Sequence, residues 1–318
     1  MTTTETTPAP GPSRQDPDEP PAVARGRAAD PTGIRRFGLQ LAGVPSLWLL
    51  VFLVVPILLM VLWSFRAPGV SSLDFVGGEP LSLDAYRVNL GTTVFLASLV
   101  RTVGMVLAVA TASVILAYPL AYLLARVAGP RRYVLLSLIV APALVSYMLR
   151  LFAWRTLLGS GGAVNAALES IGLTDGPLEF LLYNRFAVIL VLTYIWLPFA
   201  ALPIFARLEQ LNPNLLAASR DLGATPARSF RRVTLPLSVP GVDAAFFFVF
   251  IPTLGDFATA ALVGGNTGRM YGNVIRGIVG SPDFPSAAVL SLLLFAVAGL
   301  AMVIAYRVLR IEAVTDLA

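Results

Sequence analysis

The side chain best suited to a chemical role is Asp256, which lies inside a long apolar stretch, FIPTLGDFATAALVGG. An ionisable group at membrane depth is costly, so it is by default a candidate functional residue. Pro252 and Gly255 interrupt the helical pattern just before it, which would let the carboxylate face a solute pathway and attract a cation. Further aromatic rings in this and neighbouring apolar runs could present cation-binding faces to the same pathway. These candidates are Phe257, Tyr147, Trp154, Tyr194 and Trp196.

Other roles for these residues stay open on the sequence alone. Asp256 could cap the helix that follows the break by accepting hydrogen bonds from its free N–H groups. It could also form an ion pair with Arg150 or Arg155, which lie in or near the membrane in an earlier apolar run. Trp and Tyr near the ends of spans often anchor a helix at the membrane surface instead of binding a ligand.

Residue types that are absent exclude several kinds of chemistry. The 318 residues contain no Cys and no His, and all 23 basic residues are Arg. A Ser-His-Asp triad, a thiol nucleophile and a zinc site of the usual His or Cys kind are therefore excluded, and we expect no catalytic residues and no metal site. A Walker A loop needs Lys. If ATP with Mg²⁺ powers this protein, another chain must bind it, and this chain binds no cofactor itself.

Composition predicts an all-α protein that crosses a membrane several times. Hydrophobic residues make up 57% of the chain and charged residues only 13%, which is far too apolar for a soluble domain. Six apolar runs are long enough to cross a hydrocarbon core of about 30 Å. Their expected bounds are about 41–65, 94–125, 133–158, 186–206, 241–264 and 285–308.

The segments outside these spans are polar. Residues 1–32 are rich in Thr, Pro, Ala and Asp and show no apolar period, so we expect a disordered tail. The membrane domain then covers 33–310, and 311–318 form a short C-terminal tail. Between the third and fourth spans, 162–171 has the pattern of a short amphipathic helix.

The arginines predict which side of the membrane each segment occupies. Six spans place both termini on one side, and most of the arginines fall in segments on that side, including Arg126, Arg131 and Arg132. Because basic residues concentrate in cytoplasmic loops, we expect cytoplasmic termini in a bacterial plasma (inner) membrane. The net charge of +5 then reflects topology, and we expect no nucleic-acid partner.

The loop at 209–236, between the fourth and fifth spans, has the pattern of two short helices separated by a glycine. Leucines recur at helical spacing from Leu215 to Leu222, and Gly223 follows where a residue of left-handed conformation would end the helix. Thr225 and Pro226 suit the N-cap and first position of the next helix. On the expected topology, this helical loop lies in the cytoplasm.

This loop resembles the EAA loop of ABC-importer permeases, in which Glu-Ala-Ala is followed by a Gly and then by Ile, any residue, Leu and Pro. The spacing matches throughout, but Ala217 stands in place of the Glu and Ser219 in place of the second Ala. The resemblance implies that the loop seats in a cleft of a separate ATPase subunit and couples ATP hydrolysis to transport. The residues that match or flank the motif are Ala217, Ala218, Ser219, Arg220, Asp221, Gly223, Ala224, Leu235 and Pro236.

Several further phrases resemble the permeases of spermidine/putrescine importers, among them AYPLAYLLAR, SYMLRLFAWRTLLG and RDLGATPARSFRRVTLPLSVPG. The resemblance implies the MetI-like fold of type I ABC importers and transport by alternating access. It also implies three partners: a second permease subunit, an ATPase dimer and an extracellular or periplasmic solute-binding protein. From this resemblance, a polyamine is the expected solute. Related permeases with such phrases also carry ferric iron, phosphonates or opines, so these solutes remain alternatives.

Two functions outside this family were also weighed. An ion-coupled carrier working alone predicts several intramembrane acids or an inverted repeat, yet the spans contain little beyond Asp243 and Asp256. An intramembrane enzyme is disfavoured by the absence of His and Cys, although a mechanism with paired aspartates stays open. The sequence favours a transport subunit.

Overall fold

The computed structural model describes residues 31–70, 81–281 and 283–315. Every regular element within these ranges is helical, which confirms the all-α prediction. The elements are α1 (Pro31–Ser64), α2 (Asp84–Gly91), α3 (Thr93–Arg126), η1 (Gly129–Arg131), α4 (Arg132–Val140), η2 (Ala141–Leu144), α5 (Tyr147–Leu158), α6 (Ala163–Ser170), η3 (Glu179–Leu181), α7 (Arg185–Gln210), α8 (Pro213–Asp221), α9 (Pro226–Ser229), η4 (Phe230–Thr234), α10 (Leu235–Leu254), α11 (Ala258–Val263), α12 (Tyr271–Val279) and α13 (Phe284–Thr315).

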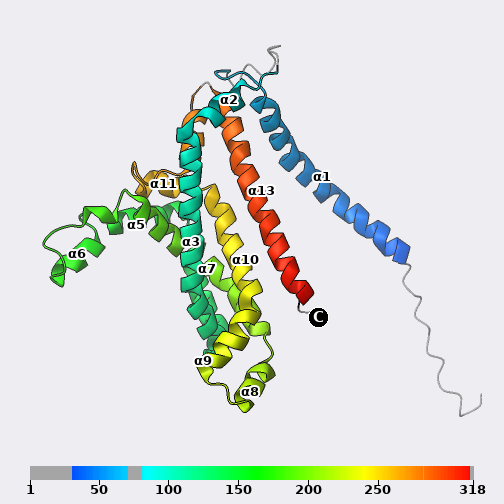
Figure 1. Cartoon of the computed structure of the whole chain (residues 1–318), viewed down its shortest axis with the longest axis vertical. Helices are drawn as coiled ribbons and strands as arrows, with labels where there is room; N and C mark the ends of the chain where they lie inside the picture. Colours follow the sequence, from blue (N-terminus) through cyan, green and yellow to red (C-terminus); the bar gives the residue numbers. More distant parts are fainter. Residues whose placement is uncertain (1–30, 71–80, 282, 316–318) are drawn as a thin grey trace, which may run out of the picture. The chain divides into compact units, whose positions relative to one another are not determined.

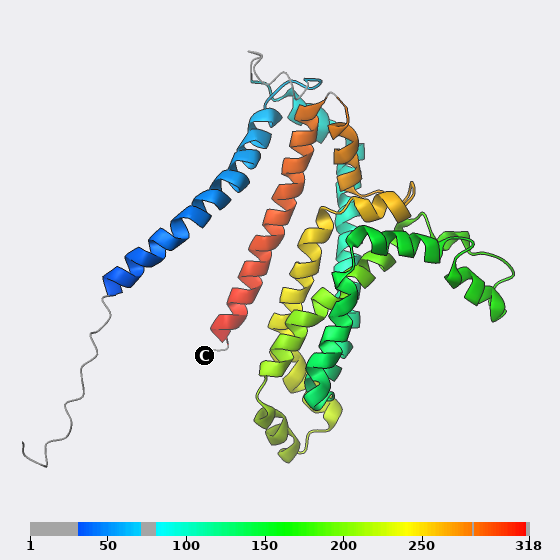
Figure 2. The same ribbon diagram turned by 180° about the vertical axis from the view of Figure 1, so that it is seen from behind.

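The chain divides into two compact units, Met1–Pro56 and Ile57–Ala318. Most of α1 belongs to the first unit. The second unit is built on α3, α7 and α10, which pack side by side (Figures 1 and 2). Its core consists of small and branched apolar side chains from these three helices, such as Val109, Ile204 and Val249, each fully buried. These helices position both candidate sites described below.

Five helices in the described ranges are long and apolar enough to cross a membrane: Pro45–Ser64, Thr93–Arg126, Arg185–Gln210, Pro226–Leu254 and Phe284–Arg307. They correspond to five of the six predicted spans. The third predicted span, 133–158, is not one straight helix, because Gly129–Leu144 and Tyr147–Ser170 meet at 87°. Val145 and Ser146 adopt extended backbone between the two parts. The sequence analysis did not predict this bend, although Pro142 lies shortly before it.

The last two predicted spans also differ in their bounds. The prediction of 241–264 placed a break in the middle, and the structure has one after Leu254, but the helix begins earlier. Pro236 is the second residue of α10 and directly follows the π-helical turn η4. α13 continues to Thr315, since neither Pro nor Gly interrupts 300–315. Residues 311–315 are therefore helical instead of forming a tail, and 316–318 lie outside the described residues. Of the predicted tail at 1–32, residues 1–30 also lie outside the described residues, whereas Pro31 and Thr32 begin α1.

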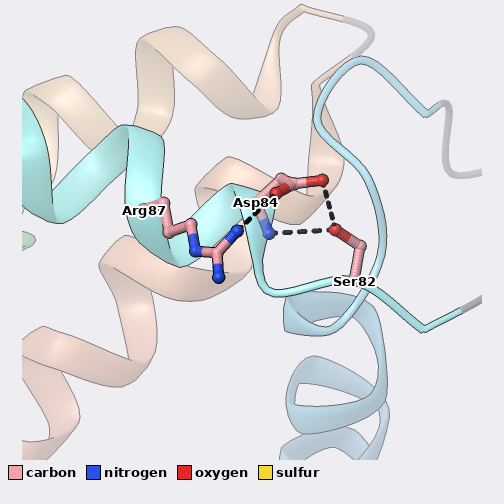
Figure 3. A network of polar contacts seen from close by, with 3 residues as sticks. All are labelled: Ser82, Asp84 and Arg87. Atoms are coloured by element: carbon pink, nitrogen blue, oxygen red, sulfur yellow. Dashed lines mark hydrogen bonds and ion pairs between the residues drawn. The ribbon is translucent and has the colours of Figure 1, made fainter.

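The short helix α2 is fixed against the start of α13. Ser82 Oγ accepts a hydrogen bond from Asp84 N (2.9 Å) and donates to Asp84 Oδ2 (2.7 Å), and Arg87 Nη1 lies 3.6 Å from Asp84 Oδ1 (Figure 3). This exposed ion pair contributes little stability. The stronger tie is buried, because Asn89 Nδ2 donates to Ser286 Oγ (2.9 Å). This hydrogen bond joins α2, which directly precedes α3, to the start of α13.

Candidate functional site

The loop between α7 and α10, which we call the coupling loop (residues 211–236), begins with a helix that is capped at both ends. Asn212 Oδ1 accepts a hydrogen bond from Asn214 N (2.9 Å), and Pro213 takes the first position of α8. At the other end, Gly223 N donates to Arg220 O (2.8 Å) and Ala224 N to Ser219 O (3.0 Å), the pair of bonds of a Schellman motif. The φ of Gly223 is 78°, which confirms the predicted left-handed glycine.

The second helix of the loop is joined directly to the membrane helix. Thr225 Oγ1 accepts a long hydrogen bond from Arg228 N (3.4 Å), so Thr225 is the predicted N-cap of α9. A π-helical turn, η4, then leads without interruption into α10. The sequence predicted a separate helix that returned to the membrane at Leu235, whereas Pro226–Leu254 is continuous. A displacement of α9 would therefore be transmitted along α10.

Two contacts that sequence reasoning did not identify hold the loop in place. Ser219 Oγ lies 2.7 Å from Ser229 Oγ and links α8 to α9. The ring of Phe230 meets Tyr118 and Tyr122 of α3 edge to face, with centroids 5.9 and 5.5 Å apart. Ser219 replaces the Ala of the EAA pattern, so the residue that departed from the motif has a structural role.

Much of the surface of α8 is uncovered within the described chain, including apolar side chains. No residue of α8 is buried, and Leu215 and Leu222 are 47% and 89% exposed. Ala217, Ala218, Arg220 and Asp221 are also exposed, as are Leu235 and Pro236 at the start of α10. A rigidly capped helix with solvent-exposed leucines is suited to docking against another protein.

The root of the loop is tied to α4 and α10 by polar contacts. Glu209 Oε1, in the last turn of α7, lies 2.8 Å from Arg132 Nη2 and accepts a hydrogen bond from Tyr133 Oη (2.7 Å). Arg207 Nε donates to Leu237 O (3.0 Å), which joins α7 to α10. These contacts fix the two points from which the loop projects.

The second candidate region is the break between α10 and α11, where the side chain of Asp256 accepts every hydrogen bond described for it. Its Oδ1 accepts from Thr259 N (2.9 Å), so Asp256 caps α11, which is one of the roles that the sequence analysis left open. Its Oδ2 accepts from Thr259 Oγ1 (3.1 Å) and from the hydroxyl of Tyr147 at the start of α5. The carboxylate thereby connects the start of α5 to the break before α11, although Tyr147 and Asp256 lie 109 residues apart in sequence.

No arginine forms an ion pair with Asp256 in the described part of the chain. Arg155 Nε donates instead to Tyr183 Oη (3.3 Å), and the Arg150 guanidinium lies 5.9 Å from the centroid of the Tyr147 ring. The half-buried carboxylate is bound only by neutral donors, so capping leaves its negative charge uncompensated. The capping role and a cation-binding role are therefore compatible.

The other predicted pathway residues do not form one cluster with Asp256. Trp154 and Tyr194 pack edge to face, with centroids 5.0 Å apart, and Trp196 lies against Phe199 at 5.5 Å. The guanidinium of Arg276 covers the ring of Phe257 at 5.2 Å. The structure thus brings Tyr147 to Asp256 and adds Thr259, three residues further along the chain, which the sequence analysis did not name.

Comparison with known proteins identifies the family. A sequence model described as the binding-protein-dependent transport system inner membrane component matches residues 177–311. The spermidine/putrescine transport system permease protein PotB of Escherichia coli (strain K12) is 31% identical over 265 residues, covering 83% of this chain and 94% of PotB. The chain belongs to the family of ABC-importer permeases.

Further likenesses agree with this assignment. The inner membrane ABC transporter permease protein YdcU of the same organism is 38% identical to this permease over 208 residues, covering 61% of the permease and 66% of YdcU. A bacterial ABC transporter that imports the acidic polysaccharide alginate has a subunit with a TM-score of 0.65 at 22% identity, covering 88% of the permease and 97% of that subunit. The MetI-like fold is confirmed, and the permease is a multi-pass inner-membrane transport subunit.

Proposed function

We propose that this permease carries a polyamine such as spermidine or putrescine into the cytoplasm, powered by ATP and Mg²⁺ bound in a separate ATPase dimer. The observation that best supports the solute is Asp256, a half-buried carboxylate at a helix break without an arginine partner among the described residues. A polyamine is a cation, and PotB is named for spermidine and putrescine. The fold alone does not select the solute, because the structurally similar alginate importer carries an acid.

The coupling loop is the proposed contact with the ATPase. Its capped helix exposes Leu222 and Leu215, and the continuous helix from Pro226 to Leu254 leads from the loop to the break beside Asp256. Twenty residues of α10 span about 30 Å at 1.5 Å per residue. In this mechanism, ATP closes the ATPase dimer, the loop moves with it, and α10 transmits the displacement to the pathway. Hydrolysis then reverses the change.

Three partners follow from this proposal: a second, PotC-like permease, a PotA-like ATPase dimer and a PotD-like periplasmic binding protein. The family description as binding-protein-dependent supports the last of these. The topology proposed from the arginines places the coupling loop and both termini in the cytoplasm, where the ATPase lies. The binding protein then delivers solute to the opposite face.

Two measurements test this function separately. Affinity purification of the tagged full-length permease from its native membrane should retain an ATPase and a second permease. Proteoliposomes of that complex should take up labelled spermidine when ATP and the binding protein are present, and unlabelled putrescine should compete whereas a phosphonate should not. Purification without any ATPase would refute the importer role. If the complex hydrolyses ATP but does not transport polyamines, only the proposed solute would be refuted. Transport of the alternative solutes, iron, phosphonate or opine, would then be assayed.

A further inference from the structure

A cavity of about 440 Å³ lies at the base of the coupling loop and is lined only by uncharged residues and arginines. Its walls come from the last turn of α3, one face of α8, and the stretch from α9 through η4. Arg126 and Arg220 supply its charge, and among the described residues no Asp or Glu lines it. A cavity with two guanidinium groups and no acid attracts an anionic group.

Arg126 shows that the cavity lacks an acceptor. Its Nη2 donates to Leu211 O over 3.4 Å, but its Nε is buried and has no hydrogen-bond partner in the described part of the chain. A buried guanidinium N–H that is left unpaired is unfavourable. Neither Arg126 nor Arg220 forms an ion pair with a described residue.

Ala217 explains why the acid is missing. It lines the cavity beside both arginines and stands at the position of the glutamate in the EAA pattern. A carboxylate on that side chain would extend from the cavity wall toward the guanidinium groups. With alanine there, no described residue lining the cavity supplies a negative charge.

The position of the cavity indicates the source of this charge. Arg126 is the last residue of the span Thr93–Arg126, and Ser229, Phe230 and Thr234 belong to the first turns of the span Pro226–Leu254. The cavity therefore lies beside the ends of two candidate spans. Basic pockets between membrane helices on the cytoplasmic side bind anionic headgroups.

The geometry of α8 separates this cavity from the surface that faces the ATPase. Pro213, Leu216, Ala217 and Arg220 line the cavity at helical spacing and share one face of α8. Successive residues of a helix turn by about 100°, so Leu215 and Leu222 lie on the opposite face. An acidic side chain of an ATPase docked on the leucines would be on the wrong side of α8 to fill the cavity.

We propose that this cavity binds the phosphate of an anionic phospholipid headgroup, which supplies the negative charge that Ala217 does not. The lipid neutralises Arg126 and Arg220 and braces α8 against α3. The site does not depend on the identity of the transported solute. The coupling loop of this permease accordingly requires an anionic lipid to hold its working position.

The test uses the full-length permease in nanodiscs of phosphatidylcholine with or without phosphatidylglycerol. Native mass spectrometry after mild detergent extraction measures retained phosphatidylglycerol, and the thermal midpoint measures its stabilising effect. We expect Arg126→Gln and Arg220→Gln each to weaken retention about fivefold, as for one basic residue at a charged membrane surface. Arg228→Gln removes the same charge from an exposed residue outside the cavity and should change retention little.

Substitutions at Ala217 provide a second test that leaves both arginines in place. Ala217→Glu should displace the lipid, and the protein should lose the thermal stabilisation by phosphatidylglycerol, whereas the uncharged Ala217→Gln should retain more lipid than the Glu variant. Equal retention by wild type, Arg126→Gln and Ala217→Glu would overturn the proposal. If inorganic phosphate in phosphatidylcholine nanodiscs stabilised wild type as much as phosphatidylglycerol, a lipid would not be the source. Likewise, if thermal stabilisation of the permease required added ATPase, the cavity would be assigned to an acidic side chain of that partner.

Discussion

The coupling loop and the break at Asp256 are both helix, turn, helix units, but contacts of very different range hold them. The Schellman motif at Gly223, the Asn212 cap and the Ser219–Ser229 hydrogen bond all join residues within ten positions of one another. At the break, Asp256 is bound by Tyr147, 109 positions away. The internal geometry of the loop is therefore set locally, although the rings of Tyr118 and Tyr122 hold Phe230 against α3, whereas the break also depends on the packing of separate helices.

The largest effect is expected from Gly223→Val. A Cβ at this glycine would meet no atom within 4 Å, so the penalty comes entirely from the φ of 78°. That strain amounts to about 1–2 kcal/mol for a β-branched residue. The spans should still assemble, but displaced α8 should uncouple hydrolysis from uptake and lower polyamine uptake at least roughly tenfold, because small misplacements at a coupling contact are costly. Uptake, ATPase retention and solute-stimulated hydrolysis measure this.

Gly172 provides the matched control for that prediction. It ends α6 with the same pair of bonds, has a φ of 71°, and likewise leaves open space for a Cβ. Gly172→Val should carry a similar local strain yet retain the ATPase and its stimulation by solute. If both variants lost coupling equally, the effect would be general destabilisation and the assignment of the coupling loop would fail.

A smaller effect is expected from Asp256→Asn. The amide oxygen can still accept from Thr259 N, so the cap of α11 survives while the negative charge is lost. We expect polyamine uptake to fall about tenfold, or about 1.4 kcal/mol, with normal assembly in size-exclusion chromatography. Asp283→Asn is the control, because Asp283 Oδ1 accepts from Ser286 N (3.3 Å) at the start of α13 and therefore also caps a helix. Unchanged uptake in Asp256→Asn would leave Asp256 with the capping role alone.

Removing one donor tests the long-range contact itself. Tyr147→Phe deletes the hydroxyl that bonds Asp256 and lies 2.6 Å from Thr259 Oγ1, without removing the charge or the ring. The charge of Asp256 and its two bonds from Thr259 remain, so we expect a decrease in uptake of about fivefold or less, equivalent to about 1 kcal/mol. A loss larger than that of Asp256→Asn would show that the connection between α5 and α11 matters more than the charge.

The contrast in range also explains what the sequence could predict. Gly223 and Thr225 were predicted in their correct structural roles because capping depends on residue type and local order. The bend at Val145–Ser146 was not predicted, although Pro142 lies three residues before Val145. The hydrogen bond of Thr259 with Tyr147 could not be predicted, since it joins residues 112 positions apart. The six apolar runs were visible, yet their ends shifted where no helix breaker followed, as in α13.

The smallest effect is expected from Thr225→Ala, which sharpens the comparison within the coupling loop itself. An N-cap contributes about 0.5–2 kcal/mol, and the low end applies here because the bond from Arg228 N is long, at 3.4 Å. α9 is also supported from its other end, since it continues through η4 into α10. We therefore expect uptake within about twofold of wild type and full ATPase retention. Asn212→Ala, which removes a 2.9 Å cap from the free-standing α8, should cost more. Should Thr225→Ala abolish coupling as Gly223→Val does, α9 would not be an extension of α10, and the transmission of motion along a continuous helix would be wrong.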